Sequence, residues 1–215
     1  MNKIPKRFIR FWIGNKTIPP KFEEWWQEFK EMHPTYEFLT IRDFEKINVP
    51  NNIKPLLRDV NTCAGVSDIG RILALYQLGG IYIDTDVMPL KPFDELINTE
   101  KVFLAKRSSK SFESAVIGSP KNHKALLEVI NQMPNWFYKY KDKAASVQTG
   151  PTFVSSVLFG REDVLHLPME TFYPYNGFMA PKRNEKIKMF SNKNNFPKEM
   201  ICAHFSNHRW GGKPK

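Results

Sequence analysis

Apolar and polar residues alternate along the chain with two different periods, and the period changes from one segment to the next. Alternating residues or short apolar runs predict strands at residues 4–13, 36–41, 81–83, 101–106 and 112–119. Apolar residues spaced by three and four predict helices at residues 21–33, 62–78 and 122–133. Because strands that alternate with helices are typical of an α/β fold, we expect a mixed, mainly parallel sheet flanked by helices.

Short polar residues and glycines mark several of the expected boundaries. Gly79 and Gly80 should end the central helix, because glycine readily adopts the backbone conformation that follows a helix. Asn122 should cap the helix at 122–133, and Asp43 should cap a short helix behind the second strand. These signals indicate well-defined ends for the elements of the first half of the chain.

The C-terminal part of the sequence has a weaker pattern. A short aromatic helix is expected after Pro134, followed by a turn at 149–151. The basic stretch at 182–198 is interpreted either as a solvated loop or as a patch that faces phosphate or a membrane. We therefore expect a single domain over residues 1–215, with an irregular C-terminal third.

Two aspartates follow the apolar strand at 81–83, in the stretch "GGIYIDTDVMPL". Carboxylates are costly at the end of a buried strand unless a cation meets them. Residues i and i+2 of an extended segment point the same way, so Asp84 and Asp86 can present two carboxylates to Mg²⁺ or Mn²⁺. Ligands of open α/β sheets bind at this edge. A helix cap or a surface turn is the alternative interpretation.

Four further side chains are candidates for a site, each with a simpler interpretation beside it. Asp68 and Arg71 lie three residues apart on the predicted helix, either as an ion pair or as groups that bind sugar hydroxyls and phosphate. Trp12 either stacks on a nucleobase or belongs to the core. His204 is either a third metal ligand or an ordinary histidine, and His208 competes for the same role.

Composition and charge narrow the class of protein. The sequence is 41% hydrophobic and 25% charged, which is ordinary for a folded protein, and its net charge of +10 favours anionic partners. Two cysteines, Cys63 and Cys202, make no disulfide framework, so a reducing compartment is expected. No apolar run approaches the roughly 20 residues that span a bilayer, and no signal cleavage site follows the N-terminus. We expect a cytoplasmic protein.

Several fragments occur together in an order that resembles the DXD-type sugar transferases of glycosyltransferase family 32. That group includes bacterial capsule and lipopolysaccharide enzymes and the yeast initiating α-1,6-mannosyltransferase, and the clostridial toxin glucosyltransferase domain is similar more distantly. The central block, S-D-x-x-R followed by G-G-I-Y-x-D-x-D, is the most specific. The fragments are "IPKRFIRFWIGN", "HPTYEFLTI", "SDIGRILALYQLGGIYIDTDV", "TGP" and "AHFSNHRW".

The resemblance implies a GT-A fold and a nucleoside-diphosphate-sugar donor, with a UDP-sugar favoured and GDP-mannose as the alternative. It also implies Mn²⁺ or Mg²⁺ and retention of the anomeric configuration. By the same likeness, Trp12 stacks on the base, while Ile13 and Gly14 line its pocket. Asp68 and Arg71 are implied to contact the sugar and the diphosphate, and with Asp84 they form the implied catalytic set.

The metal site is also implied by the resemblance. Asp84 approaches the metal and touches ribose or sugar, Asp86 ligates the metal directly, and His204 is its third ligand. The segment at 206–210, which includes Trp210, closes over the diphosphate. The family commonly ends in two adjacent histidines followed by Ser-Trp, and this chain departs from that pattern. The residue that completes the metal site therefore stays open among His204, Ser206, Asn207 and His208.

The expected activity is transfer of a hexose or N-acetylhexosamine to a polysaccharide or lipid-linked oligosaccharide acceptor. Residues 1–120 would bind the nucleotide sugar, and residues 121–215 would form the acceptor side and the closing segment. A peripheral position at an anionic inner leaflet would suit the basic charge.

Two other functions are weighed against this one. A basic nucleic-acid-binding module would fit the net charge, but the chain carries no nucleic-acid motif, so no nucleic-acid partner is expected. A metal-dependent phosphatase would also use Asp-x-Asp, but Met88 stands at the fifth position of its motif. No later pair of aspartates follows, since the later aspartates stand singly: Asp94, Asp142 and Asp163.

Overall fold

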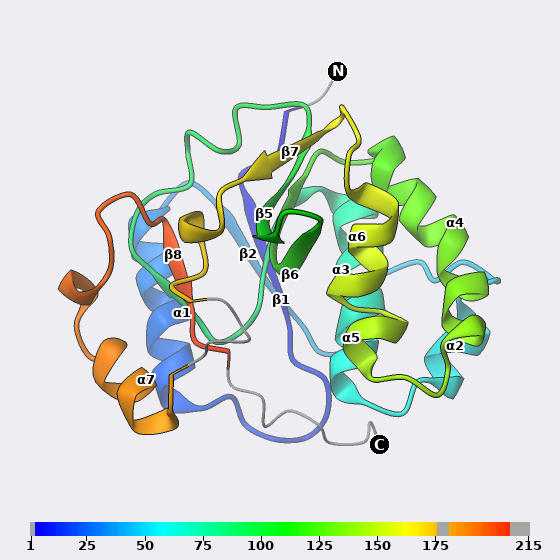
Figure 1. The fold of residues 1–215 in the computed structure, drawn as a ribbon, viewed down its shortest axis with the longest axis horizontal. Helices are drawn as coiled ribbons and strands as arrows, with labels where there is room; N and C mark the ends of the chain where they lie inside the picture. Colours follow the sequence, from blue (N-terminus) through cyan, green and yellow to red (C-terminus); the bar gives the residue numbers. More distant parts are fainter. Residues whose placement is uncertain (1–2, 176–180, 207–215) are drawn as a thin grey trace.

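A six-stranded sheet forms the centre of the computed structural model, which describes residues 3–175 and 181–206 (Figure 1). The strands are β1 (Arg7–Phe11), β2 (Glu37–Ile41), β3 (Gly80–Ile83), β5 (Val102–Ser108), β6 (Ser111–Ser119) and β7 (Val164–Leu167). Their order is β2-β1-β3-β6-β5-β7. β6 pairs antiparallel with both of its neighbours, and the other pairs are parallel. The expected mixed, mainly parallel sheet is confirmed.

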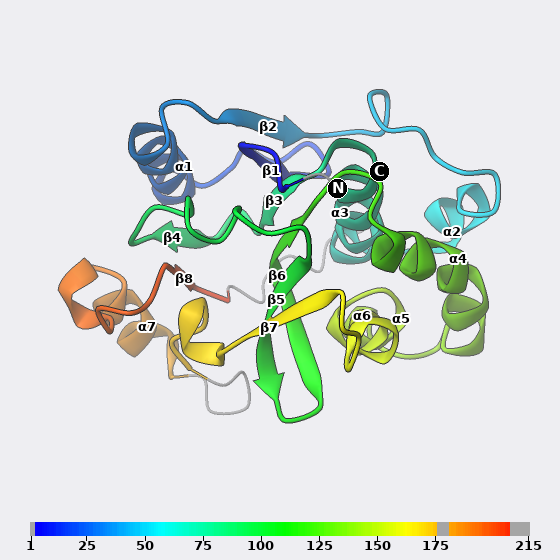
Figure 2. The same ribbon diagram turned by 90° about the horizontal axis from the view of Figure 1, so that it is seen from above.

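Helices cover one side of this sheet, as Figure 2 shows from above. They are α2 (Lys54–Asp59), α3 (Cys63–Leu78), α4 (Lys124–Lys139), α5 (Ala145–Gln148) and α6 (Pro151–Leu158). Alternate sheet residues, among them Ile9, Tyr82, Leu104 and Ile117, point into the core beneath these helices. In the part of the chain that the structure describes, no helix has both the length and the apolar character needed to cross a membrane.

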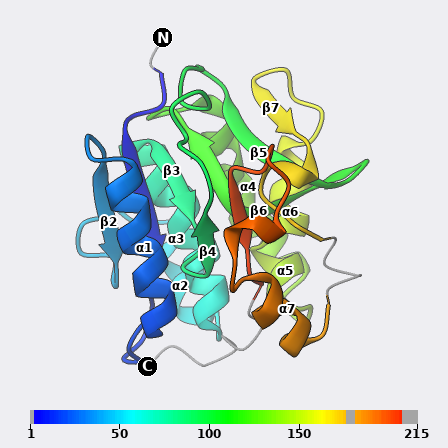
Figure 3. The same cartoon turned by 90° about the vertical axis from the view of Figure 1, so that its left-hand side faces the viewer.

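The opposite side of the sheet carries a second layer, which faces the viewer in Figure 3. It contains α1 (Pro20–Met32), α7 (Arg183–Met189), and the short turns η1 (Met169–Thr171) and η3 (Lys193–Asn195). A small antiparallel sheet of β4 (Val87–Pro89) and β8 (Cys202–His204) belongs to this layer. The remaining sheet residues, such as Phe8, Ile81 and Phe103, pack into this side.

The central helix and the strand after it position the Asp-x-Asp stretch. Thr62 caps α3 by accepting a hydrogen bond from the Gly65 N–H at 3.0 Å. Gly79, with φ of 66°, ends the helix and turns the chain directly into β3. Beyond β3, the Asp84 N–H donates to the Ala115 carbonyl at 2.8 Å. The aspartates therefore begin at the carboxyl end of a central strand.

The helix α4 differs from its prediction at both ends. It begins after His123, whose ring accepts from the Ala125 N–H at 3.2 Å, whereas Asn122 lies one residue earlier with φ of 58°. The helix also continues through Pro134 to Lys139. A proline inside a helix costs about 3 kcal/mol. Because α4 buries a whole apolar face between α3 and α6, packing outweighs that cost.

Two further expectations were wrong. Asp43 begins no helix, because its Oδ1 accepts from the Glu45 N–H at 3.0 Å and closes a local turn instead. The C-terminal third is more regular than expected, since it supplies α5, α6, β7, α7 and β8. These elements are short, and β8 has only three residues, so their sequences are too brief to show a clear period.

A close cross-strand contact gives the first testable prediction. Gly118 of β6 lies opposite Phe103 of β5, and a Cβ atom built on Gly118 would overlap the fully buried Phe103 ring. We expect Gly118→Ala to lower the free energy of unfolding by about 1–3 kcal/mol, because overpacking displaces the ring. Urea unfolding measures this change. The combination with Phe103→Leu should cost less than the sum of the two single substitutions, and additive costs would contradict the contact.

Candidate functional site

Three potential metal ligands meet at the carboxyl edge of the sheet. Asp84 and Asp86 follow β3, and His204 ends β8, where it pairs with Val87. The Nε2 atom of His204 lies 3.2 Å from Asp86 Oδ1 and 3.7 Å from Asp84 Oδ2. One ligand atom from each of the three residues lies within 4.8 Å of the others. Two carboxylates and one imidazole suit a divalent cation such as Mn²⁺.

His204 is held so that its Nε2 atom faces the carboxylates. Its Nδ1 atom lies 3.1 Å from the Ser206 hydroxyl, and its backbone N–H donates to the Phe172 carbonyl at 3.1 Å. Burial lowers the pKa of His204, but the charges of Asp86 and Asp84 outweigh burial and raise it overall. The His204 ring therefore holds its proton more tightly than a free histidine does, and a metal ion that binds here competes with that proton.

The buried guanidinium of Arg71 contacts the cluster from the helix α3. Its Nη2 atom lies 2.9 Å from Asp68 Oδ1 and 3.2 Å from Asp84 Oδ1, while Nη1 donates to the Ser114 carbonyl at 2.5 Å. The group also lies 4.4 Å from the centre of the Tyr82 ring. Burial alone would lower the pKa of Arg71, but Asp84 and Tyr82 raise it by more than burial lowers it. The guanidinium therefore stays charged.

Tyr82 completes the contacts on one side of Asp84. Its hydroxyl donates to Asp84 Oδ1 at 2.6 Å, and burial holds the pKa of the phenol well above its usual value. Asp84 Oδ1 thus receives both the Tyr82 hydroxyl and the Arg71 guanidinium, whereas Oδ2 faces His204. The carboxylate is therefore oriented with one oxygen toward the protein and the other toward the ligand cluster.

Asp68 is joined to the predicted turn at 149–151. The Thr149 hydroxyl donates to Asp68 Oδ2 at 3.1 Å, and Gly150 lies so close that a Cβ there would stand 3.1 Å from the same oxygen. Burial raises the pKa of Asp68 to about 6, although Arg71 opposes that shift. Thr149 was missed as a site residue, and its presence in the "TGP" fragment was the signal that could have revealed it.

Glu113 is a second residue that sequence reasoning missed. It lies on β6, two residues from Ala115, whose carbonyl accepts the Asp84 N–H. Arg107 lies 3.3 Å from its carboxylate, and burial raises the pKa of Glu113. The signal available in the sequence was a single acidic residue inside the otherwise apolar strand "SFESAVIGS". The structure therefore adds a carboxyl group at the margin of the cluster.

The segment predicted to bind the base adjoins the same loop. The Phe11 carbonyl accepts from the Thr85 hydroxyl at 3.2 Å, which links the end of β1 to the Asp-x-Asp stretch. The Trp12 side chain is buried, its indole N–H donates to the Lys16 carbonyl at 2.5 Å, and Gly14 has φ of 94°. Stacking by Trp12 stays a prediction. The remaining predicted residues, Asn207, His208 and Trp210, lie outside the described part of the chain.

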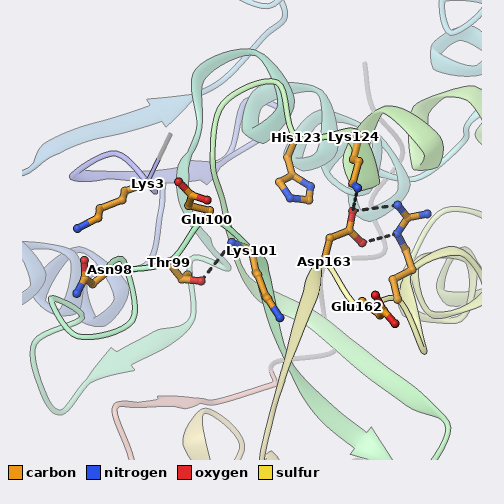
Figure 4. A pocket seen from close by; sticks show the side chains of 10 residues that line it. Lys3, Asn98, Thr99, Glu100, Lys101, His123, Lys124, Glu162 and Asp163 are labelled. Atoms are coloured by element: carbon orange, nitrogen blue, oxygen red, sulfur yellow. Dashed lines mark hydrogen bonds and ion pairs between the residues drawn. The ribbon is translucent and has the colours of Figure 1, made fainter. Parts of the chain in front are cut away.

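A second polar region lies at the amino ends of the strands, at the end of the sheet away from Asp84. It forms an open pocket of about 840 Å³ (Figure 4). Because β5 and β7 run in the direction of β3, their amino ends lie opposite Asp84. Asp163 there pairs with Arg161 at 2.9 Å and with Lys124 at 3.7 Å. This pocket is separate from the ligand cluster. It is lined by Lys3, Asn98, Thr99, Glu100, Lys101, His123, Lys124, Arg161, Glu162 and Asp163.

Comparison with known proteins identifies the region that carries the cluster's aspartates. Residues 19–103 match the family model described as "Glycosyltransferase sugar-binding region containing DXD motif". This segment is similar to the DXD-containing sugar-binding region of glycosyltransferases. Asp68, Arg71, Asp84 and Asp86 all lie within it. The resemblance predicted from the sequence motifs is therefore confirmed over this segment.

Curated relatives of the chain include mannosyltransferases of fungi. The chain is 27% identical to inositol phosphoceramide mannosyltransferase 3 of Schizosaccharomyces pombe over 171 residues, which cover 72% of this chain and 44% of that protein. It is 24% identical to the initiation-specific alpha-1,6-mannosyltransferase of Candida albicans over 126 residues, which cover 54% and 33%. The chain thus spans less than half the length of these two relatives.

Solved structures support the fold. The PaToxG glycosyltransferase matches with a TM-score of 0.63 and 21% identity, over 73% of this chain and 69% of that one. The UDP-bound glycosyltransferase domain of the YGT toxin matches with a TM-score of 0.55 and 11% identity, over 77% and 80%. The GT-A fold predicted from the resemblance is confirmed.

The raised pKa of Asp68 gives a prediction about stability. The folded pKa of about 6 exceeds the ordinary value of 3.8, so the folded state binds this proton more tightly than the unfolded state. The stabilisation is therefore complete below about pH 4 and is lost as the pH rises through about 6. Urea unfolding of the wild type and of Asp68→Asn over this range should show the wild type losing stability relative to the variant. A relative gain with rising pH would contradict the assignment.

Proposed function

We propose that the chain is a metal-dependent, retaining glycosyltransferase with a nucleoside-diphosphate sugar as its donor. The observation that carries the proposal is the cluster of Asp84, Asp86 and His204 at the carboxyl edge of a GT-A sheet, supported from behind by Arg71. The match of residues 19–103 to a DXD sugar-binding region supports the same activity.

The donor set fits a divalent cation, with Mn²⁺ favoured over Mg²⁺ because one ligand is an imidazole. When bound, such a cation neutralises the negative charge that develops on a departing diphosphate. Asp86 and the Oδ2 atom of Asp84 would hold it together with His204. Tyr82 and Arg71 fix the other oxygen of Asp84, so this carboxylate does not need to reorient when the donor binds.

Two buried residues have separate roles in donor binding. Arg71 positions both carboxylates, because its nitrogens lie within 3.2 Å of Asp84 and Asp68. Asp68, held by Thr149, is assigned to a hydroxyl group of the sugar, to which its carboxylate can serve as hydrogen-bond acceptor. Trp12, Ile13 and Gly14 are assigned to the base side, since Thr85 ties their segment to the Asp-x-Asp loop.

The donor and the acceptor are inferred at a finer level. We infer a UDP-sugar, with GDP-mannose as the alternative, and transfer of a hexose or N-acetylhexosamine. The relatives named as mannosyltransferases support a hexose, and the UDP-bound toxin domain supports a uridine nucleotide. The acceptor is inferred to be a glycan or a lipid-linked saccharide, held by the chain beyond residue 120. The net charge of +10 favours a peripheral position of the enzyme at an anionic cytoplasmic membrane surface.

A thermal-shift panel tests the proposal. UDP-, GDP- and CMP-sugars are added with and without Mn²⁺ to the wild type, to Asp86→Asn, and to Asp142→Asn as an exposed control. One nucleotide should raise the melting temperature by about 5 °C or more at a hundredfold excess over its Kd, and only with Mn²⁺. Asp86→Asn should abolish the shift because a ligand is lost, and Asp142→Asn should keep it.

Two results would contradict the proposal. The first is an absence of any shift with every donor, and the second is a full Mn²⁺-dependent shift in Asp86→Asn. If no donor gives a shift, titration with metal in the absence of nucleotide shows which part of the proposal is wrong. Metal binding without donor binding would contradict the donor assignment alone. The product's anomeric configuration, read by nuclear magnetic resonance, then tests retention.

A further inference from the structure

Lys186 stands apart from the other described lysines, because it is the one that is buried. It lies on α7, in the basic stretch that the sequence left open between a solvated loop and a phosphate-facing patch. Only 7% of its surface is exposed, whereas Arg183 and Lys188 on the same helix are exposed. Burying an ammonium group is costly unless charge or hydrogen bonds compensate for it. The location of this group therefore needs a physical explanation.

The contacts of Lys186 place it beside the ligand cluster. Its Nζ atom donates to the Ser206 carbonyl at 3.2 Å and lies 5.1 Å from the centre of the Tyr175 ring. The neighbouring Phe205 N–H donates to the Asp86 carbonyl at 2.9 Å. Burial lowers the pKa of Lys186, and the charge of Asp86 opposes that shift. The ammonium thus approaches the cluster from α7, near enough for the charge of Asp86 to act on it.

The ammonium group has hydrogen-bonding capacity left over. It offers three N–H donors, and the Ser206 carbonyl uses one. Within residues 3–175 and 181–206, no carboxylate lies within 4.0 Å of its Nζ atom. Arg71, in contrast, already contacts Asp68, Asp84 and Ser114. Lys186 is therefore a buried cation beside the cluster, and no described carboxylate lies adjacent to its charge.

We propose that Lys186 binds the diphosphate of the donor, on the α7 side of the cation held by Asp84, Asp86 and His204. This inference rests on the proposed function, since it needs a nucleoside-diphosphate donor. Lysine binds phosphate as a compact point charge with rotatable donors, and a phosphate oxygen would satisfy the remaining N–H groups. The hydrogen bond to Ser206 couples the same side chain to the segment that follows His204.

Binding measurements on the full chain test this assignment. UDP, UMP, GDP and GMP are titrated in the presence of Mn²⁺ into the wild type, Lys186→Met, Lys186→Arg and Lys188→Met. Lys186→Met keeps an unbranched side chain over Tyr175 but removes the charge, and Lys188→Met is the exposed control on the same helix. We expect Lys186→Met to weaken diphosphate binding about tenfold or more and to reduce the preference for diphosphate over monophosphate. Lys186→Arg should retain more of that preference, and Lys188→Met should retain all of it.

The other outcomes are distinguishable. Equal losses for diphosphate and monophosphate, together with a lower melting temperature, would show that Lys186 only anchors Ser206, and would overturn the inference. Unchanged binding in Lys186→Met would also overturn it. Failure of the wild type to bind any of the four nucleotides would instead contradict the proposed function. If Lys186→Met does not fold, Lys186→Gln takes its place, because the amide keeps a donor for the Ser206 carbonyl but removes the charge. The same loss of diphosphate preference would support the inference, and an unchanged preference would overturn it.

Discussion

The buried guanidinium of Arg71 is the interaction on which the rest of the site depends. Arg71 lies on α3, where it pairs with Asp68. It joins this helix to the end of β3 by contacting Asp84, and to β6 by donating to the Ser114 carbonyl. An exposed ion pair contributes about 0–1 kcal/mol, but removing one partner of a buried pair typically costs about 3–5 kcal/mol, because the remaining charge is left uncompensated. These groups therefore behave as a unit. Their arrangement explains why a buried strand can end in a carboxylate.

The other half of the ligand cluster depends on a different kind of support. His204 belongs to a strand of three residues, which pairs with another of equal length, so few backbone hydrogen bonds hold it. The next residue, Phe205, packs against Phe22 and Trp25 of α1 and against Phe190 after α7, with ring centres 5.0–6.3 Å apart. Aromatic packing thus fixes the position of His204. The site joins a polar, ion-paired side to a side that is held by apolar contacts.

The features of the site that the sequence predicts are those set by residues close together in the chain. Asp84 and Asp86 share a side because extended chain repeats every two residues, and Asp68 lies near Arg71 because a helix brings residues three apart together. Thr149 reaches Asp68 across 81 positions, and Lys186 reaches Ser206 across 20, so no local pattern records either contact. The helix through Pro134 was missed for the same reason, since burial between α3 and α6 decides it. His204 was a candidate from its residue type alone, with His208 as a rival, and the family motif did not decide between them.

On the proposed function, the charge balance of the site couples the binding of the donor to the binding of the metal. The carboxylates of Asp68, Asp84 and Asp86 outnumber the permanent cations Arg71 and Lys186, and Glu113 is matched by Arg107. With His204 neutral, as the proposed metal site requires, the described residues of the site carry a net negative charge, which would repel a diphosphate. A divalent cation reverses that sign. On the proposed function, donor binding and metal binding therefore favour each other, and this coupling follows from the excess of carboxylates.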